Sequence, residues 1–246
     1  RAIAKSYGGE LLSNVYINNN TKLKWRCSEG HEWEAVSASI INNKSWCKIC
    51  RFVQMGKNKA TPDKEIKKLV EVNKIGGLIF SIGTTKSHIE WLNKFQTVAK
   101  TPLLVTMDAE WGPSQRLSDV FAHPWNMTLG AIQDNNLVKS ISRRMAEQNK
   151  ALGINYNFAP SVDVNNNSKN PIIGNRSFGE DPENVYQKAK AYLNGHKEAG
   201  IFTSVKHFPG HGDTHVDSHS GLPLVSHTRA QAMTGDILPF SNIIRI

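Results

Sequence analysis

A loop rich in histidine and aspartate holds the densest group of chemically active side chains in the sequence. Positions 207 to 219 contain four histidines and two aspartates, and segment 206–223 contains three glycines and two prolines, which predict a loop instead of a helix or strand. A loop of this composition is more often functional than structural. One interpretation is a metal site, because imidazole and carboxylate groups are metal ligands. Its candidate ligands are His207, His211, Asp213, His215, Asp217 and His219.

A proton-transfer pair is the second interpretation of this loop. Asp217 lies two residues before His219, and its carboxylate could accept a hydrogen bond from one imidazole nitrogen. Such a bond fixes the tautomer of the imidazole and raises the basicity of the other nitrogen. A solvated loop with incidental histidines is the third interpretation, and composition alone leaves all three open.

A second group of candidate ligands lies near the N-terminus. Three residues separate Cys27 from His31, two separate Cys47 from Cys50, and fifteen lie between the two pairs. Four soft ligands in two pairs fit a structural tetrahedral zinc site, and three cysteines do not make a closed disulfide framework. Zinc would also stabilise a segment that is too poor in apolar residues to fold alone. Free thiols and an incidental histidine are the alternative.

Short apolar runs alternate with helical patterns downstream of residue 52, and this alternation predicts a parallel α/β sheet or barrel. In such folds the chemistry lies at the carboxyl ends of the strands, where Asp108, Asp163 and the Lys206–His207 pair fall. The strands are predicted at 77–82, 103–107, 155–159 and 202–205, and the helices at about 89–99, 130–151, 182–199 and 229–244.

The first fifty residues have a different character. Alternating polar and apolar residues at 22–26 and 32–36 predict short strands, and the change near residue 51 divides the chain into domains 1–51 and 52–246. Residues 1–60 hold ten basic and four acidic side chains, so most of the net charge of +9 lies there. The tryptophans of this domain are expected to pack around the metal, with weak nucleic-acid binding as the less favoured role.

Composition excludes some broad classes of protein. With 39% hydrophobic and 21% charged residues, the 246-residue chain can form a packed core, and general disorder is excluded. No run of about 18 apolar residues occurs, so no membrane-spanning helix is expected. No secretion signal is recognised either, and the compartment stays open.

Several motifs follow one another downstream of residue 52. They lie at 108–112, 157–164, 174–179 and 206–212, followed by Asp217-Ser218-His219 and Pro223. In this order they resemble the motifs of bacterial β-N-acetylglucosaminidases of glycoside hydrolase family 3. The resemblance covers about residues 52–246 and favours the proton-transfer interpretation of the loop, because this family needs no metal for catalysis. Residues 8–51 resemble zinc-ribbon domains.

The resemblance implies a role for each matching residue. His219, oriented by Asp217, would protonate the leaving sugar oxygen and then activate water. Asp163 and Arg116 are explained as well by internal salt bridges and are not assigned to the site. The residues implied to bind the hydroxyl groups of the terminal sugar are Asp108, Arg176, Lys206 and His207.

The expected fold is therefore an incomplete (β/α)8 TIM-type barrel preceded by a small zinc-ribbon-like β domain. The expected function is hydrolysis of terminal β-linked N-acetylglucosamine from glycans or peptidoglycan fragments. In the family the nucleophilic aspartate lies well downstream of the histidine loop, and the sequence ends 27 positions after His219, so only part of the active site is expected. The alternatives are an inactive zinc-binding module with a truncated sugar-binding barrel, and phosphorolysis instead of hydrolysis.

Overall fold

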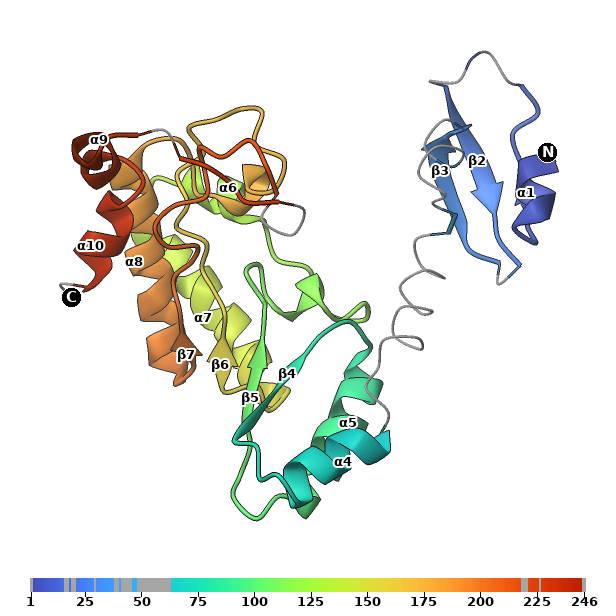
Figure 1. Ribbon diagram of the computed structural model, residues 1–246, viewed down its shortest axis with the longest axis horizontal. Helices are drawn as coiled ribbons and strands as arrows, with labels where there is room; N and C mark the ends of the chain where they lie inside the picture. Colours follow the sequence, from blue (N-terminus) through green and yellow to red (C-terminus); the bar gives the residue numbers. More distant parts are fainter. Residues whose placement is uncertain are drawn as a thin grey trace. The chain divides into compact units, whose positions relative to one another are not determined.

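The computed structural model divides the chain into two units, Arg1–Asp63 and Lys64–Ile246, here called the N-terminal and C-terminal units (Figure 1). The domain boundary predicted near residue 51 lies outside the described residues. Within the described part, no helix combines the length and the apolar character needed to cross a bilayer. The structure describes residues 2–15, 18, 21–28, 30–37, 40, 46–47, 63–217, 221–225 and 227–244.

The N-terminal unit contains a small antiparallel sheet. Helix α1 (Ala2–Ser6) precedes strands β1 (Glu10–Leu11), β2 (Lys22–Arg26) and β3 (Glu32–Val36), and the sheet order is β1-β2-β3. Strands β2 and β3 have the bounds that their alternating residues predict. Sequence analysis missed α1 and β1, which are short and carry little periodic signal.

Three tryptophans form the centre of this small unit. Trp25 is 2% exposed and lies in a buried cluster with Leu23 and Ile40. The ring of Trp46 contacts Trp25 and Trp33 edge-on, at centroid distances of 5.7 and 4.9 Å. These aromatic contacts supply much of the apolar burial of a unit with few aliphatic residues. The tryptophans therefore pack against one another.

The C-terminal unit is built on a parallel sheet, in which each strand pairs with the next along the chain in the order β4-β5-β6-β7. Helices α7 and α8 pack against each other beside β6 and β7 (Figure 1). The strands are β4 (Gly77–Phe80), β5 (Leu104–Met107), β6 (Tyr156–Asn157) and β7 (Phe202–Thr203). The α-helices are α4 (Asp63–Glu71), α5 (Thr85–Val98), α6 (Asn126–Gly130), α7 (Asn135–Ala151), α8 (Pro182–Ala199), α9 (Arg229–Thr234) and α10 (Leu238–Ile244).

Local sequence signals explain the bounds of α8, which match the prediction. The Asp181 carboxylate accepts hydrogen bonds from the backbone amides of the first turn, and Pro182 occupies a position where a missing N–H costs nothing. Gly200 ends the helix in the left-handed conformation, with φ of 79°.

The prediction of one helix at 229–244 is wrong, because the structure has α9 and α10 with a break between them. Gly235 adopts a backbone conformation outside the helical region, with φ of −110° and ψ of −102°. The helix predicted at 130–151 is present as α7 but begins five residues later, because Asp134 caps its start, and residue 130 is the last residue of α6.

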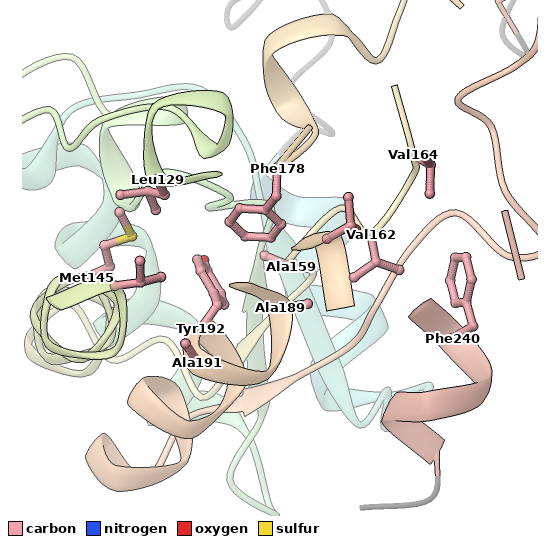
Figure 2. Close-up of a cluster of buried hydrophobic side chains, with 12 residues drawn as sticks. Leu129, Met145, Ala159, Val162, Val164, Phe178, Ala189, Ala191, Tyr192 and Phe240 are labelled. Carbon is pink, nitrogen blue, oxygen red and sulfur yellow. The ribbon is translucent and has the colours of Figure 1, made fainter. Parts of the chain in front are cut away.

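The core of the C-terminal unit lies between α7, α8 and the segment that follows β6. Figure 2 shows Phe178 and Tyr192 between Met145 on one side and Val162 on the other. Val162 and Val164 both belong to this buried cluster, and Asp163 lies between them in the chain. The Asp163 carboxylate is buried as well, but it binds the polar groups of Ser161 and His207.

Candidate active site

The carboxyl ends of three neighbouring strands bring the predicted site residues together. Asp108 follows β5 directly, Asp163 lies beyond β6, and Lys206 lies just beyond β7. An isolated parallel bridge between Ser161 and Lys206 continues the pairing of β6 with β7 toward this edge. Since the strands are parallel, their carboxyl ends lie at one edge of the sheet, which is where the sequence places the chemistry.

Lys206 joins two acidic side chains at this edge. Its Nζ atom lies 2.7 Å from Oδ1 of Asp108 and 3.0 Å from Oε1 of Glu110. Arg116 donates from Nη2 to the other oxygen of Asp108, at 2.8 Å. The Glu110 side chain is fully buried and those of Lys206 and Asp108 are mostly buried, so these ion pairs are poorly screened by solvent.

Arg176 makes the second set of contacts to Glu110. Its Nε and Nη2 atoms lie 3.0 and 2.7 Å from the two carboxylate oxygens, a bidentate arrangement that fixes the plane of the guanidinium. The same Nη2 lies 3.1 Å from Nε2 of His207. A guanidinium only donates, so this Nε2 is the acceptor and His207 carries its proton on Nδ1.

The Nδ1 proton of His207 is directed to Asp163, whose carboxylate accepts several hydrogen bonds in the site. Its Oδ2 atom lies 2.6 Å from Nδ1 of His207 and accepts the hydroxyl of Ser161 at 2.8 Å. Its Oδ1 atom accepts the backbone amide of His211 at 2.7 Å. One buried carboxylate thereby fixes both the imidazole of His207 and the backbone of the loop that follows.

The carboxyl groups of the site are held in their charged form. Burial alone would raise the pKa of Asp108 and of Glu110. The hydrogen bonds and charges of Lys206 and Arg116 hold the pKa of Asp108 below its ordinary range, and those of Arg176 and Lys206 do the same for Glu110. Burial opposes ionisation of Asp163 as well, and the hydrogen bond from His207 lowers its pKa. The site is therefore rich in fixed charges suited to polar ligands.

A series of hydrogen bonds between buried polar groups connects the strand ends to the helices. The amide of Asn157, in β6, bonds to the backbone N–H and C=O of Ala109 at 2.9 and 3.0 Å and donates to Nε2 of His196 at 3.0 Å. Nδ1 of His196 lies 2.8 Å from the hydroxyl of Ser142, which donates to the carbonyl of Tyr192. Burial lowers the pKa of His196 to about 4. These bonds join the end of β5 to β6, α7 and α8.

The structure groups the four residues predicted to bind a sugar, Asp108, Arg176, Lys206 and His207, through the contacts described above. Asp217 is described, and its carbonyl accepts the amide of Gly221 at 3.1 Å. His219 lies outside the described residues, so its predicted pairing with Asp217 stays a prediction.

Sequence reasoning gave no role to Glu110 and left Asp163 out of the site. The signal for Glu110 was its place two residues after Asp108 at the same strand end. The signal for Asp163 was its place in an apolar segment, between Val162 and Val164. Neither signal shows which side chains Glu110 and Asp163 bind.

A metal site in the histidine loop is not assembled by the described residues. No three described donor groups of this loop lie within 4.8 Å of one another. His207 and His211 instead bind Asp163, through the imidazole and the backbone amide respectively. Asp213 lies 3.0 Å from Nε2 of His227.

Among the described residues, one cluster of three possible metal ligands is found, and it lies in the N-terminal unit. Atoms of Cys27, His31 and Cys47 lie within 4.8 Å of one another. Nδ1 of His31 is 3.4 Å from Sγ of Cys27 and 3.7 Å from Sγ of Cys47. Around a tetrahedral zinc ion the usual bond lengths place a sulfur and a nitrogen about 3.6 Å apart, so the three side chains fit that metal. The fourth predicted ligand, Cys50, lies outside the described residues.

Two basic side chains of β2 form ion pairs with acidic residues of the N-terminal unit. Lys24 binds Glu32, and Arg26 binds both Glu10 and Glu32. These ion pairs reduce the free positive charge on β2, and nucleic-acid binding stays a prediction.

Comparison with known proteins identifies the family. Residues 48–245 match the Glycosyl hydrolase family 3 N terminal domain, and the chain belongs to this family. Beta-hexosaminidase A of Pseudoalteromonas piscicida is 38% identical over 194 residues, which cover 74% of this chain and 32% of that protein. A beta-hexosaminidase of Haemophilus influenzae is 34% identical over 160 residues, covering 63% of this chain and 45% of that protein.

Solved structures show the same relationship. A glycoside hydrolase family 3 beta-N-acetylglucosaminidase from a Paenibacillus species is 37% identical with a TM-score of 0.70, over 74% of this chain and 36% of that one. NagZ from Neisseria gonorrhoeae is 27% identical with a TM-score of 0.66, over 74% of this chain and 56% of that one. The chain thus spans between about a third and somewhat over half of these relatives. The α/β fold expected from the sequence is confirmed.

Proposed function

We propose that the C-terminal unit is the sugar-binding and acid/base part of an enzyme that hydrolyses terminal β-linked N-acetylglucosamine. The observation that carries this proposal is the network of Asp108, Lys206, Glu110, Arg176 and His207 at the carboxyl ends of the strands. Charged donors and acceptors in fixed positions suit the hydroxyl groups of a sugar. Relatives named beta-hexosaminidase and beta-N-acetylglucosaminidase support the substrate class, in which we include glycans and peptidoglycan fragments.

In the proposed mechanism, two groups of residues have different roles. Asp108, Arg176, Lys206 and His207 hold the terminal sugar. His219, oriented by Asp217, donates a proton to the departing glycosidic oxygen and then accepts one from the attacking water. A retaining mechanism also needs a nucleophilic carboxylate, which we assign to no residue of this chain. Strands β4 to β7 would form part of the wall of a (β/α)8 barrel, in keeping with their order.

Binding and turnover test the proposal separately. Calorimetry should show that N-acetylglucosamine binds the chain and that Asp108→Asn weakens this binding. Without an assigned nucleophile, hydrolysis of para-nitrophenyl N-acetyl-β-glucosaminide by this chain should be slow, and it should fall further, by about a hundredfold or more, in His219→Ala, the usual effect of losing a general acid/base. His215→Ala is the matched control, because the exposed His215 contacts Asn167 outside the site.

The outcomes distinguish the alternatives. Absence of sugar binding would contradict the proposed function. Binding without turnover would support the inactive sugar-binding module, and a rate that rises with added phosphate would support phosphorolysis. Full activity in His219→Ala would remove the acid/base assignment.

We also propose a structural zinc ion in the N-terminal unit, held by Cys27, His31, Cys47 and Cys50. The distances among the first three support this set, and their soft donor atoms suit zinc. Cys27 and His31 lie in the turn between β2 and β3, where the amide of Cys27 bonds to the carbonyl of His31 at 3.1 Å. The metal would stabilise a zinc-ribbon-like domain and take no part in catalysis.

A further inference from the structure

Two indole rings stack on each other in the long connection between β5 and α7. The centroids of Trp111 and Trp125 lie 4.2 Å apart and their planes differ by 11°. Trp125 is 45% exposed and Trp111 is partly exposed. Trp125 is more exposed than tryptophan usually is, because this residue type is highly buried on average.

Both indoles are adjacent in the chain to residues that bind Arg176. Trp111 follows Glu110, whose carboxylate holds the Arg176 guanidinium at 2.7 and 3.0 Å. Trp125 precedes Asn126, whose amide donates to the Arg176 carbonyl at 2.9 Å. Each indole is therefore the chain neighbour of a residue that holds Arg176, one of the proposed sugar-binding residues.

Hydrogen bonds hold the backbone at Trp111 and at Trp125. Trp111 lies in a tight turn in which the amide of Gly112 bonds to the carbonyl of Ala109 at 3.1 Å. Gly112 has a positive φ of 84°, and a Cβ atom there would lie 2.9 Å from the ring of His123. Trp125 caps α6, and its carbonyl accepts the amides of Thr128 and Leu129. Rings held in place before binding lose little conformational entropy when a ligand arrives.

We propose that Trp111 and Trp125 form a platform for the second sugar ring, the one that departs when the terminal N-acetylglucosamine is released. The C–H groups on one face of a pyranose pack well against an indole, and the sugar hydroxyls stay in water at the rim. This inference rests on the proposed function and adds a specificity for a sugar as the leaving group. The exposed Trp125 is the main contact.

Calorimetry with two ligands tests the platform. The 246-residue chain should bind the disaccharide N,N′-diacetylchitobiose more tightly than N-acetylglucosamine. Trp125→Ala should weaken disaccharide binding by about three- to tenfold, the range of one aromatic stacking contact, and should leave monosaccharide binding unchanged. Trp125→Phe should restore part of the disaccharide affinity.

Phe121→Ala is the matched control, because Phe121 is an aromatic residue of the same connection that is 68% exposed and lies outside the stacked pair. It should bind both sugars as the unmodified chain does. The platform is overturned if Trp125→Ala binds the disaccharide normally, or if it weakens both sugars equally. If the unmodified chain binds the monosaccharide and gains nothing for the disaccharide, the platform is overturned and the proposed function stands. If the chain binds neither sugar, both the platform and the proposed function are overturned.

Discussion

The Nδ1 atom of His207 lies 2.6 Å from Oδ2 of Asp163, a carboxylate with no exposed surface. The opposite ring nitrogen accepts from Arg176 at 3.1 Å, so the imidazole is held from both sides. This pair links the core to the site, because Asp163 lies between two valines of the buried cluster. The tautomer and the orientation of His207 therefore depend on a fully buried carboxylate.

Replacing Asp163 by asparagine tests this dependence. The amide nitrogen of asparagine donates and does not accept, so at least one donor among Ser161, His207 and His211 would lose its partner. We expect a loss of about 1–3 kcal/mol in the free energy of unfolding, measured with urea, together with weaker binding of N-acetylglucosamine. Unchanged sugar affinity in a folded Asp163→Asn variant would show that His207 does not need this partner.

Glu110 is the second carboxylate whose loss should be costly. In Glu110→Gln the Arg176 and Lys206 cations would no longer face a negative charge between them. We expect destabilisation of about 3 kcal/mol, at the lower end of the cost of breaking a buried ion pair. Glu180→Gln, at an exposed position, is the matched control and should unfold like the unmodified chain. Equal stability of the two variants would contradict the assigned role.

The pH dependence of stability should report the burial of His196. Its pKa in the folded chain is about 4, below the ordinary value of 6.5, so the unfolded chain binds the proton more readily. The corresponding stabilisation is complete above pH 6.5 and is lost as the pH falls toward 4, by about 3 kcal/mol. His196→Gln should flatten the urea-unfolding profile in this window. Burial also lowers the pKa values of His88 and His123, which act in the same direction. An identical slope in His196→Gln would contradict this account.

Close backbone packing beneath the histidine loop gives a fourth prediction. A Cβ atom on Gly212 would lie 1.6 Å from the carbonyl oxygen of Val164, so the loop cannot keep its position with alanine there. We expect Gly212→Ala to destabilise the fold by about 3 kcal/mol or more. Gly76→Ala is the control, because nothing lies within 4 Å of the added atom. Similar melting temperatures for both variants would show that the loop adapts.

Metal removal tests the zinc proposal. Mass spectrometry of metals should find one zinc ion per chain, and a chelator should expose β2 to trypsin at Lys22, Lys24 and Arg26. Cys27→Ser should behave as the chelated chain does, whereas His215→Ala, in the other unit, should keep its zinc. Equal resistance of the N-terminal unit to trypsin with and without metal would contradict a stabilising role.

Local patterns predicted the elements with clear periodicity or caps. Strands β2 and β3 follow their alternation, and α8 lies between Asp181 and Gly200 as helix signals require. The break at Gly235 was missed, because the apolar pattern continues across it while the backbone does not. Short elements such as β1 depend on a pairing partner and leave little trace in their own residues.

The candidate site was predictable in position but not in its internal contacts. Strand ends identify Asp108 and Lys206, because parallel strands bring such ends together. Which carboxylate binds which cation depends on the folded chain. Glu110 meets Arg176 across 66 positions, and no spacing in the sequence encodes that contact.

The charges of the ionised side chains in the site add up to zero. The described side chains of the site include three carboxylates and three cations, although the chain as a whole has a net charge of +9. A charge-neutral surface exerts little long-range force, so approaching molecules gain no electrostatic steering there. Affinity for an uncharged sugar should then vary little with ionic strength, and selection depends on the directions of short-range bonds. The balanced groups are Asp108, Glu110 and Asp163 against Arg116, Arg176 and Lys206.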